Sequence, residues 1–297
     1  MKPCRVALVG IAFALGVSSV VSAQSGSYRL SVVASGLSRP TGIALDGSDD
    51  LYFTEIPDPG MGGGANGVSH LDLNSRVITR ISTGEPEPTN LAVSRGGDVY
   101  WTCKSAGVIL RHLEATGMTA AFATGLHEPS GISVGRRDHV YVTEIPTPGV
   151  PGTAGGRNTV SVLRGDSKMV ISMGEPEPTD VVVAKNEDLY WTCKTAGVIL
   201  KRSAGVTSVL RANLKAPSGI ALDHKGEVLY FTEVPTPGVS GANGGRNRVR
   251  MLTLATGALR TINKGDPEPV DVAVARNGNV YWTCASAGVI VEAARRH

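Results

Sequence analysis

The stretch VYWTCKSAGVIL, residues 99–110, recurs almost unchanged as LYWTCKTAGVIL at 189–200 and as VYWTCASAGVIV at 280–291. A second unit recurs between these copies: PTGIALDGSDDLYFTEIPDPG from Pro40, PSGISVGRRDHVYVTEIPTPG from Pro129 and PSGIALDHKGEVLYFTEVPTPG from Pro217. The chain therefore consists of three copies of one block, at 36–124, 125–212 and 213–297. A fixed period of this size indicates a repeat architecture in which every copy folds as the same unit.

Each block divides into two similar halves that have the pattern of β-strands. Both halves begin with Pro-x-(Gly/Asn/Asp) before an apolar run, and then pass through a Gly- or Asp-rich turn into an apolar–Tyr–aromatic–Thr segment. Residues 43–45, 46–48 and 51–54 form one such strand, turn and strand. A half-block of about 44 residues has room for four short antiparallel strands, which make one propeller blade. The predicted fold is all-β, a six-bladed β-propeller built from three two-blade repeats.

The two ends of the chain predict how the ring closes. A fourth strand, at 118–123 and at 206–210, ends each of the first two blocks, whereas the third block stops shortly after its third strand at 288–293. Residues 28–34, YRLSVVA, precede Ser-Gly-Leu just as 118–123 precede Thr-Gly-Leu. We therefore expect the N-terminal strand to complete the last blade, which removes two exposed strand edges.

Residues 1–23 have the features of a secretory signal peptide. Lys2 and Arg5 precede the apolar stretch 6–21, and Val21-Ser22-Ala23 fits a cleavage site. The propeller is then 24–297, and the expected location is secreted or periplasmic. No later stretch is apolar enough to span a membrane. Removal of Lys2 and Arg5 lowers the formal charge from +3 to +1, which argues against a nucleic-acid partner. We expect a monomer.

Three cysteines remain beyond the signal peptide, and they occupy the same position of each block: Cys103, Cys193 and Cys284. Equivalent positions of a rotational repeat lie far apart, so we expect neither a disulfide nor a metal shared by the three thiols. Each cysteine alternates onto the same side of its strand as the neighbouring tryptophan. The expected role is that of a small buried residue between blades.

Three features gather at one end of the predicted propeller, where the loop after the second strand of a blade lies beside the loop before the first strand. The odd-blade loops 57–67, 146–157 and 235–246 are about 10 residues longer than their even-blade equivalents, and loops on a rigid scaffold commonly carry ligand contacts. The second feature is the motif Glu-Pro-Glu-Pro from Glu85 and from Glu175, with Asp-Pro-Glu-Pro from Asp266. The third is the glutamate that closes the second strand of each odd blade, at Glu55, Glu144 and Glu233.

These carboxylates, together with Asp180 and Asp271, admit two interpretations. One is a ring of salt bridges and loop caps, with Lys104, Lys194, Arg157 and Arg246 as partners. The other is a divalent cation at the channel mouth, for which Ca²⁺ fits a ligand set made only of oxygens.

Pro-x-Gly-Ile-Ala-x-Asp followed by Leu-Tyr-Phe-Thr-Glu resembles the NHL and SMP-30/gluconolactonase group of propellers and the streptogramin lyases. Tyr-Trp-Thr-Cys resembles the YWTD blades of lipoprotein receptors, with cysteine in place of the last aspartate. The resemblance covers essentially the whole chain after residue 23. It implies the fold but no single activity, because these families include lactone hydrolases, lyases and binding modules.

The SMP-30 resemblance also implies a metal in the channel, held by Glu, Asn and Asp. Thr41, Ser130 and Ser218 stand where the family has Asn or Asp before Gly. Asn90, Asp180 and Asp271, one residue further along in the even blades, offer a substitute set of metal ligands.

His127 marks a departure from the threefold sameness of the loops. It lies in Gly-Leu-His-Glu-Pro-Ser-Gly, and its equivalents are Ser38 and Lys215. A ligand without threefold symmetry is recognised where the three copies differ, so His127, Glu128 and Glu144 are the acid–base candidates. The alternative is that His127 is a histidine of a surface loop without a catalytic role. The candidate ligand-binding residues are Asn90, Arg157, Lys215 and Arg246.

Two functions fit these features. The first is a secreted propeller that binds a small molecule, glycan or protein at the channel mouth on its long-loop face. The second is an SMP-30/gluconolactonase-like metal-dependent lactone hydrolase, or a streptogramin-lyase-like enzyme, that uses a metal at the channel mouth and His127.

Overall fold

The structure, a computed structural model, describes residues 23–25, 27–57, 65–146, 157–165, 167–235, 237 and 246–296. The proposed signal peptide, apart from Ala23, and most of the three long loops lie outside the described residues. Among the described residues, no helix is long and apolar enough to cross a membrane. The strands in chain order are β1 (Ala23–Ser25), β2 (Tyr28–Ser35), β3 (Pro40–Leu45), β4 (Leu51–Glu55), β5 (Gly67–Leu71), β6 (Ile78–Thr83), β7 (Pro88–Val93), β8 (Val99–Cys103), β9 (Val108–Leu113), β10 (Met118–Ala123), β11 (Pro129–Val134), β12 (Val140–Glu144), β13 (Thr159–Arg164), β14 (Ser167–Met173), β15 (Pro178–Val183), β16 (Leu189–Cys193), β17 (Val198–Ser203), β18 (Val206–Arg211), β19 (Pro217–Leu222), β20 (Val228–Glu233), β21 (Arg248–Thr253), β22 (Leu259–Lys264), β23 (Pro269–Val274), β24 (Val280–Cys284) and β25 (Val289–Arg295).

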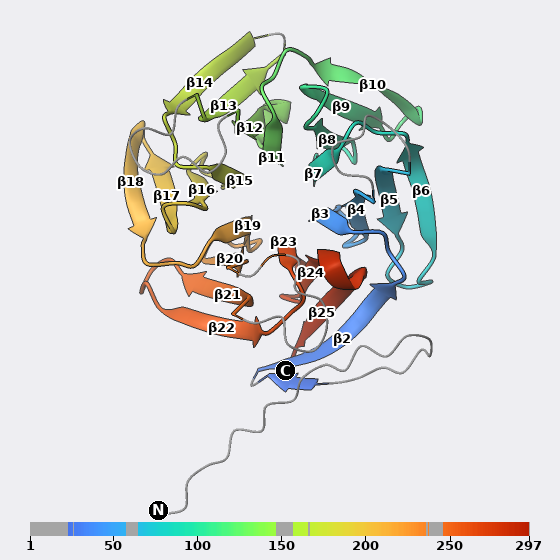
Figure 1. Ribbon diagram of the computed structural model, residues 1–297, viewed down its shortest axis with the longest axis vertical. Coiled ribbons are helices and arrows are strands. Elements are labelled where there is room, and N and C mark those ends of the chain that lie inside the picture. Colours follow the sequence, from blue (N-terminus) through green and yellow to red (C-terminus); the bar gives the residue numbers. More distant parts are fainter. Residues whose placement is uncertain are drawn as a thin grey trace, which may run out of the picture.

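Six antiparallel sheets stand as blades around a central axis (Figure 1). Five blades contain four consecutive strands each, and the first strand of every blade, from β3 to β23, lies innermost. In the described part of the chain, two short 3₁₀ helices, Arg136–Asp138 and Ala285–Ala287, interrupt the loops. The predicted six-bladed architecture is confirmed.

The sixth blade joins the two ends of the chain. Its sheet has the order β1-β2-β25-β24-β23, with Tyr28 opposite Arg295 and Ser35 opposite Val289. The N-terminal strand therefore completes the last blade as predicted. The short strand β1, which the sequence pattern did not predict, adds one further strand outside β2.

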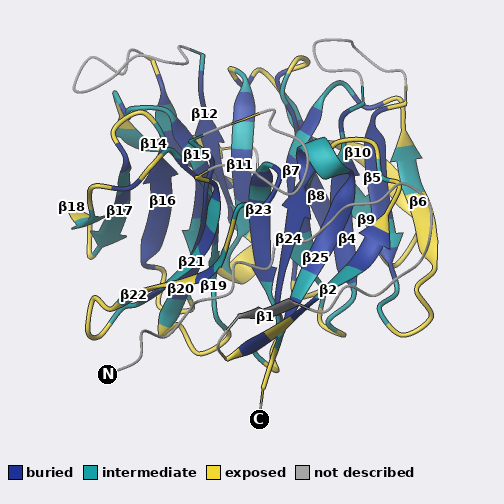
Figure 2. Cartoon of the chain, turned by 60° about the horizontal axis from the view of Figure 1, so that its bottom comes forward, coloured by how far each residue is buried: buried dark blue, intermediate teal, exposed yellow. Residues whose placement is uncertain are grey.

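The hydrophobic cores lie between neighbouring blades, and the outer strands expose one face (Figure 2). Trp101, Trp191 and Trp282 are fully buried in these cores. The three cysteines are free and buried, as predicted. Because burial removes a thiolate from water, it raises the pKa of each thiol well above its ordinary value. They are therefore packing residues and not reactive groups.

Within the described ranges, the threonine of the apolar–Tyr–aromatic–Thr motif bonds to the next blade in four of the six blades. Thr192 Oγ1 accepts a hydrogen bond from the N–H of Asp180 at 3.2 Å and donates one to the carbonyl oxygen of Ser218, on the next inner strand, at 2.5 Å. The β15–β16 register is irregular beside Asp180, so this N–H takes the hydroxyl as its acceptor. All six equivalents are fully buried: Thr54, Thr102, Thr143, Thr192, Thr232 and Thr283.

Candidate functional site

The inner strands bring Asn90, Asp180 and Asp271 together around the propeller axis. Each is the third residue of its strand, in β7, β15 and β23, and Gly42, Gly131 and Gly219 hold the equivalent position of the alternating strands. A Cβ on Gly131 would lie 2.4 Å from Asp180 Cα and 2.6 Å from Asp180 Oδ1. The odd blades therefore need glycine here, because the side chain of the neighbouring even blade fills the space.

Backbone N–H groups hold both aspartates in place. Asp180 Oδ1 accepts from the N–H of Val181 at 2.8 Å, and its Oδ2 accepts from the N–H of Ile220 on the next blade at 2.8 Å. Asp271 repeats this pattern: its Oδ1 accepts from the N–H of Val272 at 2.7 Å, and its Oδ2 accepts from the N–H of Ile43 on the next blade at 2.9 Å. The carboxylates are thus bound on two neighbouring blades each.

Asn90 breaks the threefold pattern. Its Oδ1 accepts from the N–H of Leu91 at 2.6 Å, and its Nδ2 donates to Asp180 Oδ1 at 3.0 Å. An amide in this place presents a donor to the aspartate, whereas a third carboxylate would repel it. Because Asn90 is uncharged, the repulsion among the three polar side chains is smaller than it would be among three carboxylates.

The two aspartates behave as one titrating unit. Burial raises the pKa of Asp271 to about 7, and burial together with the charge of Asp271 raises the pKa of Asp180 well above its ordinary value. Both carboxyls therefore resist ionisation, and the charge of Asp271 adds to the effect of burial on Asp180.

This donor set does not fit Ca²⁺, which takes roughly six to eight oxygen ligands. The carboxylate oxygens already accept backbone N–H groups, and Asn90 turns its Nδ2, not its oxygen, toward Asp180. Metal analysis of the purified protein tests the calcium prediction.

A cavity of about 380 Å³ begins at these three residues and runs along the axis. Its walls include the last residue of every inner strand, an aliphatic side chain that is half-buried: Leu45, Val93, Val134, Val183, Leu222 and Val274. Lys185, Asp223 and His224, in the turns that follow two inner strands, also line it. The cavity therefore opens at the end of the propeller opposite to the long loops.

The glutamates that close the second strands cap loops at the long-loop end. Glu144 Oε1 accepts from the N–H of His127 at 2.8 Å, and its Oε2 pairs with Lys168 at 2.5 Å. Burial alone would raise the pKa of Glu144, but the hydrogen bonds from Lys168 and His127 hold it below its ordinary value. Such a carboxylate stays ionised and tightly held. Glu55 and Glu233 cap Ser38 and Lys215 in the same way, at 2.8 and 2.7 Å.

The predicted site residues thus separate into two groups. Asn90, Asp180 and Asp271 meet on the axis, whereas the others lie at the long-loop end and none of them lines the cavity: His127, Glu128, Glu144, Arg157, Lys215 and Arg246. The side chain of His127 is exposed, and Glu128 pairs with Lys104 at 3.5 Å. Within the described part of the chain, Arg157 and Arg246 form no ion pair. The expected meeting of His127 with the axial aspartates is not observed.

The first acid of each Glu-Pro-Glu-Pro motif points into a core. Glu85 accepts from Trp101 Nε1 at 3.2 Å, from Cys103 Sγ at 3.6 Å, and from Ser82 Oγ. Glu175 makes the same contacts in the second block. These acids therefore satisfy the buried indole N–H groups and do not face a ligand.

The third copy has a shorter acid at this place. Asp266 Oδ1 accepts from Asn263 Nδ2 at 2.8 Å, but Asp266 Oδ2 and Trp282 Nε1 are buried without a hydrogen-bond partner. Burial raises the pKa of Asp266 to about 7. One missing methylene group thus leaves Asp266 Oδ2 and Trp282 Nε1 without a hydrogen bond of normal geometry, although Trp282 still lowers the pKa of Asp266, and this poorer pairing costs stability.

Transplanting the residues of the other copies should stabilise the protein. We expect Asn263→Ser with Asp266→Glu to raise the free energy of unfolding by about 1 kcal/mol, because the longer acid reaches Trp282 Nε1. The folded protein holds Asp266 protonated up to about pH 7, whereas the unfolded chain releases that proton near its ordinary pKa. Wild-type stability from this group therefore falls as the pH rises from about 4 through 7, and the gain should be larger at pH 8 than at pH 5.

Thermal unfolding at the two pH values measures the effect. The reciprocal change, Ser82→Asn with Glu85→Asp, is the matched control and should destabilise the protein. Equal melting temperatures for the wild type and the transplanted variant at pH 8 would contradict this explanation.

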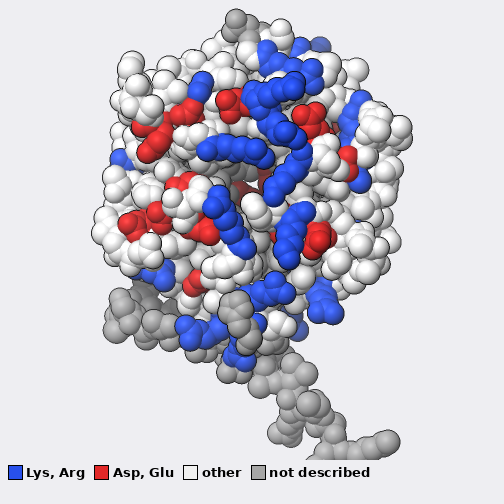
Figure 3. All heavy atoms as spheres, turned by 180° about the vertical axis from the view of Figure 1, so that it is seen from behind, with Lys and Arg blue, Asp and Glu red and all other residues white. Residues whose placement is uncertain are grey.

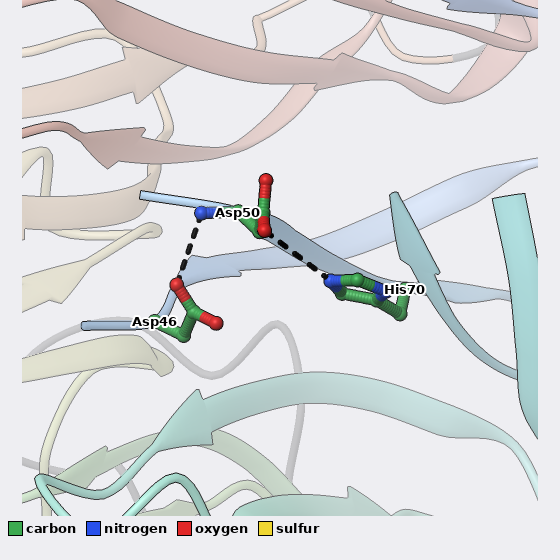
Figure 4. Close-up of side chains that lie close together, drawn as sticks. All are labelled: Asp46, Asp50 and His70. Atoms are coloured by element: carbon green, nitrogen blue, oxygen red, sulfur yellow. Dashed lines mark hydrogen bonds and ion pairs between the residues drawn. The ribbon is translucent and has the colours of Figure 1, made fainter. Parts of the chain in front are cut away.

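Asp46, Asp50 and His70 form a cluster in the first blade whose ligand atoms lie within 4.8 Å of one another (Figure 4). Asp46 Oδ1 accepts from the N–H groups of Ser48 and Asp50 at 2.7 and 3.0 Å, and Asp50 Oδ1 accepts from the N–H of Leu73 at 2.9 Å. His70 Nε2 lies 3.9 Å from Asp50 Oδ2. The cluster stabilises the β3–β4 turn, and we assign it a structural role.

Comparison with known proteins supports the fold. No family model matches the chain, and no curated protein matches it significantly. A gluconolactonase from Xanthomonas campestris superposes with a TM-score of 0.70 at 14% identity, covering 99% of this chain and 100% of that chain. A streptogramin B lyase does so with a TM-score of 0.64 at 18% identity, covering 91% and 98%. A chain of a nidogen/laminin complex gives a TM-score of 0.61 at 17% identity, covering 75% and 80%.

These likenesses define the class of protein: a six-bladed β-propeller of the kind found in gluconolactonases and streptogramin B lyases. At such low identity they establish the fold alone. Since structures of this class include enzymes and a chain from a protein complex, the function has to be argued from the site.

Proposed function

We propose that this protein is a secreted or periplasmic β-propeller that binds a small molecule in its axial cavity. The observation that carries the proposal is the cavity itself, about 380 Å³ in volume, with aliphatic walls and three convergent polar side chains at its inner end. Small-molecule sites commonly have a volume of roughly 300–1,000 Å³, mostly apolar walls and a few polar groups. The location rests on the signal-peptide pattern, and mass spectrometry of exported protein should find Gln24 at its N-terminus.

The proposal moves the ligand from the long-loop face to the other end of the axis. At the long-loop end, the candidate residues of the described chain are used for other purposes: Glu144 caps a loop and Glu128 pairs with Lys104. A glycan or protein bound by the long loops remains the alternative occupant of that face. The axial cavity has the better support because three polar side chains converge at its inner end and six aliphatic side chains line its walls.

A blocking variant tests the proposal. Val183 lines the cavity at the end of β15, so Val183→Trp should fill the cavity near its mouth. Small molecules that raise the melting temperature of the wild type should lose this effect in Val183→Trp, because bound ligand stabilises the native state. Val170→Trp, at a 50% exposed position on the outer strand β14, is the control and should respond like the wild type. Hits that stabilise all three proteins equally would rule out the axial cavity.

A hydrolase or lyase is the second candidate, and the Asp180–Asp271 pair favours it. Two neighbouring carboxyls with raised pKa values at the inner end of the cavity are the kind of groups that serve as general acid and general base. Lactone hydrolysis and lyase screens with and without chelator, together with metal analysis, address this function. Turnover that is lost in Asp271→Asn while the melting temperature is retained would establish an enzyme; absence of turnover with a bound ligand would establish a binding protein.

A further inference from the structure

A ring of cationic side chains surrounds the mouth of the axial cavity. In every blade a turn joins the inner strand to the second strand, and the second residue of this turn follows the inner strand closely. Five of the six turns carry a basic residue at this position, and glycine is the sixth: Arg95, Arg136, Lys185, His224, Arg276 and Gly47. Lys185 and His224 line the cavity directly.

In the part of the chain that the structure describes, the lysine and arginine side chains of the ring form no ion pair that a ligand would have to break. Among the described residues, none of Arg95, Arg136, Lys185 and Arg276 forms an ion pair, and all four are exposed. Lys185 Nζ instead donates to the carbonyl oxygen of His224 at 2.6 Å. Arg276 extends across the gap in the ring, since its Nη2 would lie 3.8 Å from a Cβ on Gly47.

Most acids of the same turns are held by bonds within their blades or lie towards the second strand, and Asp223 lines the cavity beside Lys185 and His224. Asp98 pairs with Arg111 and Asp188 with Lys201 on the third strands of their blades. Asp46 and Asp223 accept backbone N–H groups of their own turns. The remaining turn acids occupy the fourth or fifth turn position: Asp49, Asp50, Asp138, Glu187 and Glu227. Of these, Asp49 accepts from the backbone N–H of Arg276 at 3.2 Å.

The surface shows this sorting of charge. On the face without the long loops, Lys and Arg side chains gather around a central hollow, and acidic atoms are visible in its depth (Figure 3). Cations arranged around a cleft with low-dielectric walls concentrate anions at its mouth. The aspartates at the inner end oppose entry of a second negative charge.

Resting on the proposed function, we infer that the ligand of the axial cavity is a small amphipathic organic anion. Its charged group lies among Arg95, Arg136, Lys185 and Arg276, and its apolar part lies against the six aliphatic side chains of the wall. The positive mouth and the acidic inner end together impose one orientation, with the anionic group outward. A neutral or cationic molecule of the same shape lacks this match.

Three probes of equal chain length test the inference: octanoate, octan-1-ol and octylamine. Isothermal titration at low salt should show octanoate as the tightest binder. Its affinity should fall as the ionic strength rises, because exposed charges are screened by salt. Lys185→Gln with Arg276→Gln should weaken octanoate binding about tenfold and leave octan-1-ol unchanged. Lys264→Gln, an exposed residue at the end of β22, is the control and should bind like the wild type.

The outcomes separate the two proposals. Octan-1-ol or octylamine binding as tightly as octanoate, with Val183→Trp abolishing it, would overturn the anion inference and retain the axial cavity as a ligand site. Failure of all three probes to bind would overturn the inference and count against the proposed function as well. Octanoate binding that is insensitive to Val183→Trp would place the anion elsewhere and overturn the inference.

Discussion

Deleting residues 24–35 should prevent stable folding, and this is the largest effect we expect from any change. The deletion removes β2, whose backbone pairs along the length of β25. It also removes Tyr28 and Leu30 from the core around Trp282 and Val33 from the core around Phe53. Burial of three such side chains contributes about 6 kcal/mol, which is comparable to the net stability of about 5–15 kcal/mol that a folded domain has.

Circular dichroism and size-exclusion chromatography of the truncated protein, compared with a protein that begins at residue 24, measure this effect. A finer pair of variants avoids total unfolding: Leu30→Ala, at a position that is 1% exposed, should cost about 3 kcal/mol. Arg29→Ala, on the exposed face of the same strand, should cost little. A truncated protein with the melting temperature of the parent would refute closure by the N-terminal strand.

Gly131→Ala should have the second largest effect. The added Cβ would lie 2.4 Å from Asp180 Cα and 2.9 Å from the carbonyl oxygen of Thr179. These are atoms of the neighbouring inner strand, so relief requires the two blades to move apart. Overpacking of this kind costs about 3 kcal/mol, which lowers the melting temperature of a domain of this size by roughly 10 °C.

Gly96→Ala is the matched control in a turn of the second blade. Its added Cβ would make an ordinary contact of 3.7 Å with Ser94 Oγ, so the melting temperature should change little. Thermal unfolding of both variants decides the matter. If Gly131→Ala melts like the wild type, the inner strands do not approach each other as closely as the structure shows.

The fold was largely predictable because it follows from repetition and from local patterns. Three blocks of two half-blocks imply six equivalent units, and alternating apolar residues with Gly- and Asp-rich turns indicate strands. The missing last strand and the matching segment at 28–34 predicted the closure at β2. The loop-cap interpretation of Glu55, Glu144 and Glu233 also agrees with their contacts, since these glutamates recur at the same place in every block.

The candidate site was predicted only in part. The sequence grouped Asn90, Asp180 and Asp271 as equivalent residues, and the structure brings them together on the axis. His127 and Glu144 were expected beside them because their loops share one end of the propeller. They do not line the cavity, because the three axial residues form its inner end and the cavity extends from them away from the long loops. The signal that could have shown this was the basic residue at the second position of five turns.

The sequence by itself thus determined the number of blades, the closing strand and the reduced state of the cysteines, because each depends on which positions repeat. Only the tertiary structure decided where a cavity forms, which carboxylates face it and which form hydrogen bonds or ion pairs with neighbouring groups. Glu85 precedes an inner strand and Glu144 ends a second strand, and both lie at the long-loop end, yet one binds an indole N–H and the other a lysine. Such roles depend on distances between strands that are far apart in the chain, and repetition of sequence does not specify those distances.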